Sequence, residues 1–151
     1  MREVLQKYLN VISWILAILV TIVGVVAWAQ NNNWQFTGLS NYELFPVFGI
    51  VAFSLMWCHY VVGGIKAGFA LDKVEHNKLH FEVTAGVVLV ALLLHPTVLI
   101  WQLWRDGFGL PPGSYSVYVA PGLLWVVYLG TLSWLVFLCF ELRRWFGKKS
   151  W

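Results

Sequence analysis

The stretch VTAGVVLVALLLHPTVLIW, from Val83 to Trp101, is apolar along almost its whole length and contains no Asp, Glu, Lys or Arg. Its length approaches the ~20 residues that a helix needs to cross ~30 Å of hydrocarbon. A run of this length predicts a helix rather than a strand, because in lipid every backbone polar group must be bonded within the protein. Three further runs share this character, and they cover Val11–Ala29, Phe45–Ile65 and Gly122–Phe140.

The composition supports the same fold class. Hydrophobic residues make up 60% of the 151 residues, charged residues only 11%, and the mean hydropathy is +0.71. Soluble domains carry about 25% charged residues, so this chain could not solvate its surface in water. We expect an all-α integral membrane protein, a four-helix bundle that forms one domain over residues 1–151. Its spans are expected at about residues 11–29, 45–70, 80–103 and 121–142.

The basic residues predict the orientation of the bundle in a membrane, which we expect to be a bacterial inner (plasma) membrane. Lys and Arg are concentrated before the first span, between the second and third spans, and after the fourth span, whereas only Arg105 falls on the other side. The positive-inside rule therefore places both termini and the connection Lys66–His80 in the cytoplasm. The net charge of +3 is thus a topology signal, and we expect a lipid bilayer and no nucleic acid as partner.

Enzyme motifs are missing from the sequence. There is no Gly-rich phosphate loop and no nucleotide-binding βαβ pattern. The spans hold no Ser-His-Asp, Cys-His or paired-carboxylate arrangement. The chain is at most the transmembrane electron-transfer part of an oxidoreductase, without an NAD(P)H or flavin domain of its own.

Two histidines inside the spans, His59 and His95, are the strongest candidate site residues, because ionisable groups in a membrane are costly. The midpoint between them is Asn77, in the polar segment Glu75–Lys78 where the chain is expected to turn. Residues equidistant from the turn of a helical hairpin lie at one depth. Two imidazoles at one depth can supply both axial ligands of a haem iron. We therefore predict His59 and His95 as iron ligands of one haem b.

Other interpretations of these two histidines stay open. An intramembrane histidine also serves as a hydrogen-bonding residue that holds helices together. Met56, one turn from His59, is an alternative ligand, although packing explains it as well. Zinc is disfavoured because no third or fourth ligand stands at that depth.

His80 is a further candidate, because it precedes His95 by 15 residues. On one helix this spacing offsets the two side chains by ~60° and ~22 Å. Both could face the bundle interior near opposite leaflets, which would give a second haem site. His76 and His80 could equally be ordinary interfacial histidines, and we expect one haem in a monomer, with two as the alternative.

A family resemblance rests on Leu79-His80, Gly86 and Leu94-His95-Pro96, preceded by the segment Phe45–Phe53. Over residues 43–140 the chain resembles the ferric reductase-like transmembrane domain, and it also looks like small b-type cytochromes of the cytochrome b561 kind. The resemblance implies that His80 and His95 bind haem near opposite membrane faces. The chain departs from the pattern in a spacing one residue longer, and in lacking the helix with the partner histidines and the FAD/NADPH module. These departures leave His59 as the partner of His95.

The first functional hypothesis is a membrane b-type cytochrome that passes single electrons through a bis-histidine haem and depends on a separate redox partner. The alternative is a haem-free accessory or structural subunit of a larger membrane complex, and an oligomer is compatible with both. A transporter is a weaker third reading, since only the Pro96 region offers a broken helix near the midplane.

Overall fold

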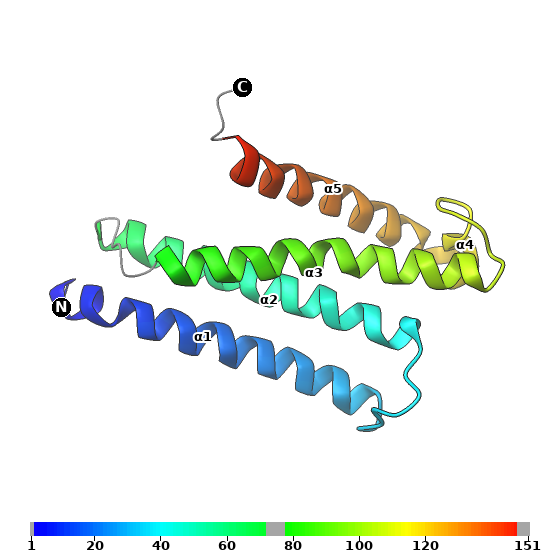
Figure 1. Cartoon of the computed structure of the whole chain (residues 1–151), viewed down its shortest axis with the longest axis horizontal. Coiled ribbons are helices and arrows are strands. Elements are labelled where there is room, and N and C mark those ends of the chain that lie inside the picture. Colours follow the sequence, from blue (N-terminus) through cyan, green and yellow to red (C-terminus); the bar gives the residue numbers. More distant parts are fainter. Residues whose placement is uncertain (1, 72–77, 148–151) are drawn as a thin grey trace.

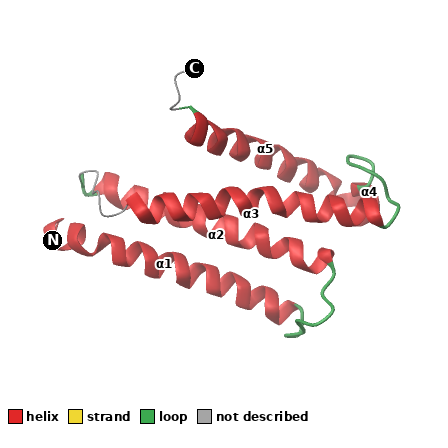
Figure 2. Ribbon diagram, in the orientation of Figure 1, coloured by secondary structure: helices red, strands yellow, loops and turns green. Residues whose placement is uncertain are grey.

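The computed structural model describes residues 2–71 and 78–147, and these residues form helices and no strand (Figure 2). Four segments are long and apolar enough to cross a membrane, which confirms the predicted number of spans: Tyr8–Asn31, Asn41–Gly68, Lys78–Arg105 and Pro121–Arg143. The full helices are α1 (Arg2–Asn31), α2 (Asn41–Gly68), α3 (Lys78–Arg105), the short α4 (Tyr115–Tyr118), the 3-10 turn η2 (Pro121–Leu123) and α5 (Leu124–Phe146).

Both ends of α2 differ from the predicted span of residues 45–70. The helix begins at Asn41, because the Ser40 N–H donates to Oε2 of Glu43 at 2.7 Å and satisfies a backbone group at the first turn. It ends at Gly68, and Ala70 takes a left-handed conformation with φ 45°. The Leu71 N–H then bonds back to the Lys66 carbonyl at 3.0 Å, as in a helix C-terminal cap.

Helices α1, α2 and α3 form the core of the bundle, with α2 packed against both of the others (Figure 1). A close approach of α1 and α2 occurs at Gly24, where a Cβ atom would stand 2.5 Å from Cγ2 of Ile50. Small residues let membrane helices approach closely, so Gly24 is needed for this contact. Two clusters of buried apolar residues lie in the core, one of Ala17, Leu55, Cys58 and Val88 and one of Leu9, Val62 and Leu71.

Helix α5 lies outside this core, beside α3, and runs back toward the end of the molecule where α1 begins (Figure 1). None of the residues in its most apolar window is buried. Most of its large apolar side chains are exposed, as are many of those of α1, which suits a surface covered by lipid tails.

Polar contacts join three elements at the opposite end, where α2 begins and α3 ends. The Tyr42 hydroxyl donates to Oδ2 of Asp106 at 2.8 Å, and the Gln102 amide donates to both Asp106 oxygens at 2.9 and 3.0 Å. The Tyr42 ring also stacks on Tyr118 of α4, with centroids 5.5 Å apart. The hydrogen bonds from Gln102 and Tyr42, helped by the charge of Arg105, lower the pKa of Asp106.

This lowered pKa predicts a loss of stability in acid. A group whose pKa is depressed by folding stabilises the fold above its unfolded pKa, about 3.9 for Asp, and this contribution disappears as the pH falls through the folded pKa. We expect the melting temperature of the purified protein to fall more steeply between pH 5 and pH 3 (roughly the range where Asp titrates) than that of Asp106→Asn. Tyr42→Phe, which removes one of the donors, should show an intermediate slope. Equal slopes for all three proteins would contradict this role of Asp106.

Candidate functional site

His80 lies in the first turn of α3 and is fully buried. Both of its ring nitrogens are buried without a hydrogen-bond partner among the described residues. Its ring packs edge-on against Trp14 of α1, with centroids 4.8 Å apart, and against Phe81 at 5.4 Å. A buried polar group without a partner costs about 1–3 kcal/mol, so two such nitrogens on one side chain call for an explanation.

His59, on α2, stands next to His80. The two ring centroids are 6.1 Å apart and the ring planes are inclined at 79°. Imidazoles that bind one metal ion from opposite sides, at about 2 Å from each ring nitrogen, hold their centroids roughly 6 Å apart. The separation of the two rings is compatible with two imidazoles that would hold one metal ion between them.

Thr84 connects these histidines through its hydroxyl. Its Oγ1–H donates to the carbonyl of His80, one turn earlier, at 2.5 Å. Because that proton is committed, Oγ1 acts as the acceptor for Nε2 of His59, also at 2.5 Å. The proton of the neutral His59 ring therefore sits on Nε2, and the lone pair lies on Nδ1.

The predicted meeting of His59 and His95 at one depth is wrong. His59 lies at the level of Thr84, whereas the His95 ring contacts the Phe45 carbonyl at the other end of α2. Thr84 and His95 are 11 residues apart on α3, which corresponds to ~16 Å along the helix. The physical reason is the early end of α2 at Gly68, which moves the midpoint of the contacts between α2 and α3 from Asn77 to about Leu71.

The structure thus brings together His59 and His80, and it places His95 elsewhere; that any of the three binds haem stays a prediction. The structure gives less support to the other candidate ligands. Met56 packs beside the buried core residues Leu55 and Cys58, in agreement with a packing role. His76 lies outside the described residues. Those residues contain no group of three or more His, Cys, Asp or Glu side chains that could hold a metal ion, so zinc gains no support.

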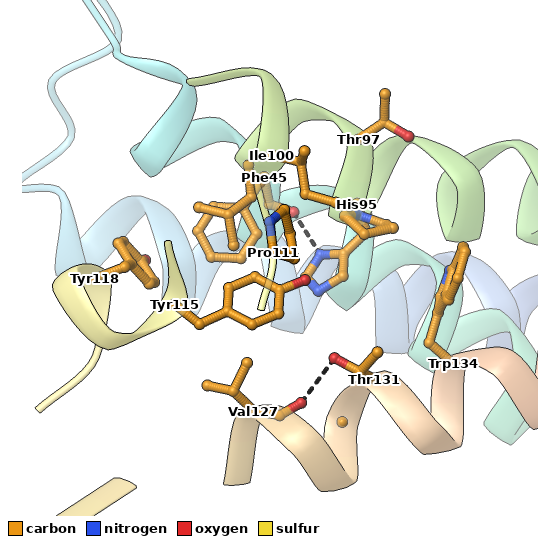
Figure 3. Close-up of a pocket in the computed structure, with 13 residues that line it drawn as sticks. Phe45, His95, Thr97, Ile100, Pro111, Tyr115, Tyr118, Val127, Thr131 and Trp134 are labelled. Carbon is orange, nitrogen blue, oxygen red and sulfur yellow. Dashed lines mark hydrogen bonds between the residues drawn. The ribbon is translucent and has the colours of Figure 1, made fainter. Parts of the chain in front are cut away.

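His95 is held in one orientation by α2. Its Nδ1 donates to the Phe45 carbonyl at 2.8 Å, and its ring lies so close to Gly49 that a Cβ atom there would be 2.8 Å from it. Since a carbonyl can only accept, the proton sits on Nδ1 and Nε2 carries the lone pair. The ring borders a cavity of about 510 Å³ between α3, α4 and α5 (Figure 3).

Pro96 explains how α5 is attached beside this cavity. Pro96 has no N–H, so the carbonyl of Leu92, four residues earlier, loses its partner within the helix. The indole Nε1 of Trp134 on α5 donates to this carbonyl at 2.6 Å. A broken helix at Pro96 was expected from the sequence, and the donor Trp134 was not.

Sequence reasoning missed Trp14, Trp134 and Tyr115, because contacts between distant helices leave no local pattern. The contact between His80 and Thr84 could have been predicted from their spacing, since residues four apart share one helix face.

Comparison with known proteins finds no match for this chain among family models, curated proteins or solved structures.

The tie between Trp134 and Leu92 can be measured with a double-mutant cycle. Trp134→Phe leaves the Leu92 carbonyl without a donor, and we expect a loss of about 1 kcal/mol in the free energy of unfolding, a typical value for polar contacts between membrane helices. In the Pro96→Ala background the N–H of residue 96 supplies the donor, so the same change should cost clearly less. Reversible unfolding in detergent micelles gives the four stabilities. An equal cost of Trp134→Phe in both backgrounds would rule out the proposed link.

Proposed function

We propose that this protein is a membrane b-type cytochrome that passes single electrons through a haem whose iron is held by His59 and His80. The observation that carries this proposal is His80, whose two ring nitrogens are buried without a hydrogen-bond partner among the described residues. A bond to a metal would satisfy one of them. Haem b, when bound, supplies an iron that gains and loses one electron at a time.

The donor set fits this group. Haem b brings most of its iron ligands with it, so His59 and His80 would be sufficient to hold it in the protein. The pair of imidazoles comes from the neighbouring helices α2 and α3, at a ring separation of 6.1 Å. Because both axial positions would be filled by histidine, electron transfer is favoured over the binding of oxygen.

The residues around the pair support the proposal. The Thr84 hydroxyl fixes the orientation and the tautomer of His59, as hydrogen-bonding neighbours of metal ligands do. Trp14 and Phe81 give His80 an apolar surrounding that excludes water. The Lys66 ammonium lies 4.6 Å from the centroid of the Phe81 ring, a cation close to the pair that suits the carboxylates of a haem.

The proposal also includes a separate redox partner and an orientation of the helices in the membrane. The sequence has no Gly-rich phosphate loop for a nicotinamide or flavin nucleotide, so the electrons have to come from another molecule. We place both termini in the cytoplasm of a bacterial inner membrane, following the excess of Lys and Arg on that side. The pair His59 and His80 then stands in the cytoplasmic half of the bundle, because His80 is in the first turn of α3.

The haem can be tested by absorption. Protein purified from membranes of haem-supplied cells should show a Soret band and sharp bands on reduction, with about one haem per chain in a pyridine haemochrome assay. We expect His80→Ala and His59→Ala to lower the haem content about tenfold or more, and Thr84→Val to weaken haem binding about tenfold, as for neighbours of metal ligands. His95→Ala is the matched control, since it removes a histidine of the same helix and should keep the haem.

Two results would contradict the proposal that His59 and His80 hold a haem. Loss of haem in His95→Ala, with His80→Ala unaffected, would return the ligand role to His95. Colourless wild-type protein that co-migrates with a large membrane complex would favour the haem-free accessory subunit. Circular dichroism of every variant shows that the helices are intact.

The orientation is tested separately with single cysteines. In a background with Cys58→Ala and Cys139→Ala, Gln35→Cys labels the loop after α1, and Lys78→Cys labels the start of α3. A membrane-impermeant maleimide should modify Gln35→Cys in intact cells, and Lys78→Cys only after lysis. The reverse pattern would place the termini outside.

A further inference from the structure

We propose that the cavity beside His95 binds the hydroxylated aromatic ring of a lipid-soluble molecule, such as a phenol or a quinol. The cavity has a volume of about 510 Å³, within the range of about 300–1,000 Å³ typical of small-molecule sites. It shares no lining residue with the pair of His59 and His80. The proposal therefore goes beyond the proposed function and does not depend on it.

Two polar groups at the cavity can recognise a hydroxyl. Nε2 of His95 is an acceptor, because Nδ1 carries the proton that is donated to the Phe45 carbonyl. The side chain of Tyr115, which is only 7% exposed, extends across the cavity toward the His95 ring (Figure 3). A ligand hydroxyl that lies between them can donate to Nε2 and accept from the Tyr115 hydroxyl.

Three of the four other lining side chains with polar atoms already donate a hydrogen bond, and the fourth, Tyr118, stacks on Tyr42 with ring centroids 5.5 Å apart. The Thr131 hydroxyl donates to the Val127 carbonyl at 2.9 Å, and the Trp134 indole donates to the Leu92 carbonyl. Thr97 likewise donates to the Leu93 carbonyl, at 2.6 Å. The remaining walls are mainly apolar, from Phe45, Pro96, Leu99, Ile100, Pro111 and Val127. This lining favours an apolar ring with one hydroxyl over a charged or highly polar ligand.

The position of the cavity indicates the medium from which the ligand comes. Thr97 of α3 and Gly130 of α5 both line the cavity and are both exposed, and each lies within a membrane-spanning segment. The cavity therefore reaches the lipid-facing surface between α3 and α5. A molecule dissolved in the bilayer can enter by this route.

Gly130 offers a way to close the cavity without removing a polar group. A Cβ atom at Gly130 would meet no atom within 4 Å, so a larger side chain has room there. We expect Gly130→Phe to fill part of the cavity and to prevent ligand binding while the fold is kept. This variant tests the cavity itself, whereas His95→Ala tests the recognition of the hydroxyl.

The experiment compares two ligands of nearly the same shape in nanodiscs, with empty nanodiscs as the reference for partition into lipid. Isothermal titration should show 4-tert-butylphenol binding about tenfold more tightly than 4-tert-butylanisole, which lacks the donor proton. In His95→Ala this difference should disappear, and in Gly130→Phe both ligands should lose binding. His80→Ala should bind both as the wild type does. Ubiquinol-1, titrated in parallel, distinguishes a quinol from a simple phenol.

Three results would overturn the proposal. The first is equal affinity of the wild type for the phenol and the anisole. The second is a preference for the phenol that survives in His95→Ala. The third is a loss of bound haem in His95→Ala, which would make His95 an iron ligand instead. Failure of haem binding in the wild type would leave the phenol titration unaffected, so the two proposals fail separately.

Discussion

A side-chain hydroxyl in the middle of a membrane protein has no water to bond with, and Thr84 shows how strongly this constrains the bundle. Its hydroxyl is bonded on one side to its own helix and on the other to His59 of α2. These two bonds fix which residues of α2 and α3 lie side by side. The register in turn puts His80 against His59 and leaves His95 near the opposite end of α2, so both candidate sites follow from one contact.

The elements of the fold were predictable from the sequence because hydrocarbon imposes a length and a composition on each span. The register was not, because it depends on where α2 stops. Gly68 and the left-handed Ala70 end the helix before the polar segment that was expected to form the turn. When the midpoint of a helical hairpin shifts by a few residues, the residue that lies opposite a given position shifts by twice as many. This shift placed His80, rather than His95, beside His59.

The sequence identified the histidines of the candidate sites, but it did not predict which residues contact them. Histidines inside apolar spans stand out in any sequence, and all three have defined positions in the structure. Their neighbours come from other helices: Trp14 from α1, and Tyr115 and Trp134 from the segments after α3. One helix therefore carries two candidate sites of different character, an enclosed aromatic one around His80 and a roomier one that borders the cavity at His95.

The loose attachment of α5 has a consequence for the assembly of the protein. The buried core is made by α1, α2 and α3, and α5 adds its indole donor to a carbonyl that α3 already leaves open at Pro96. The first three helices can therefore associate as a unit as soon as they are in the membrane, with His59 and His80 already in contact. We expect the fourth span to join last, and its arrival completes the walls of the cavity beside His95.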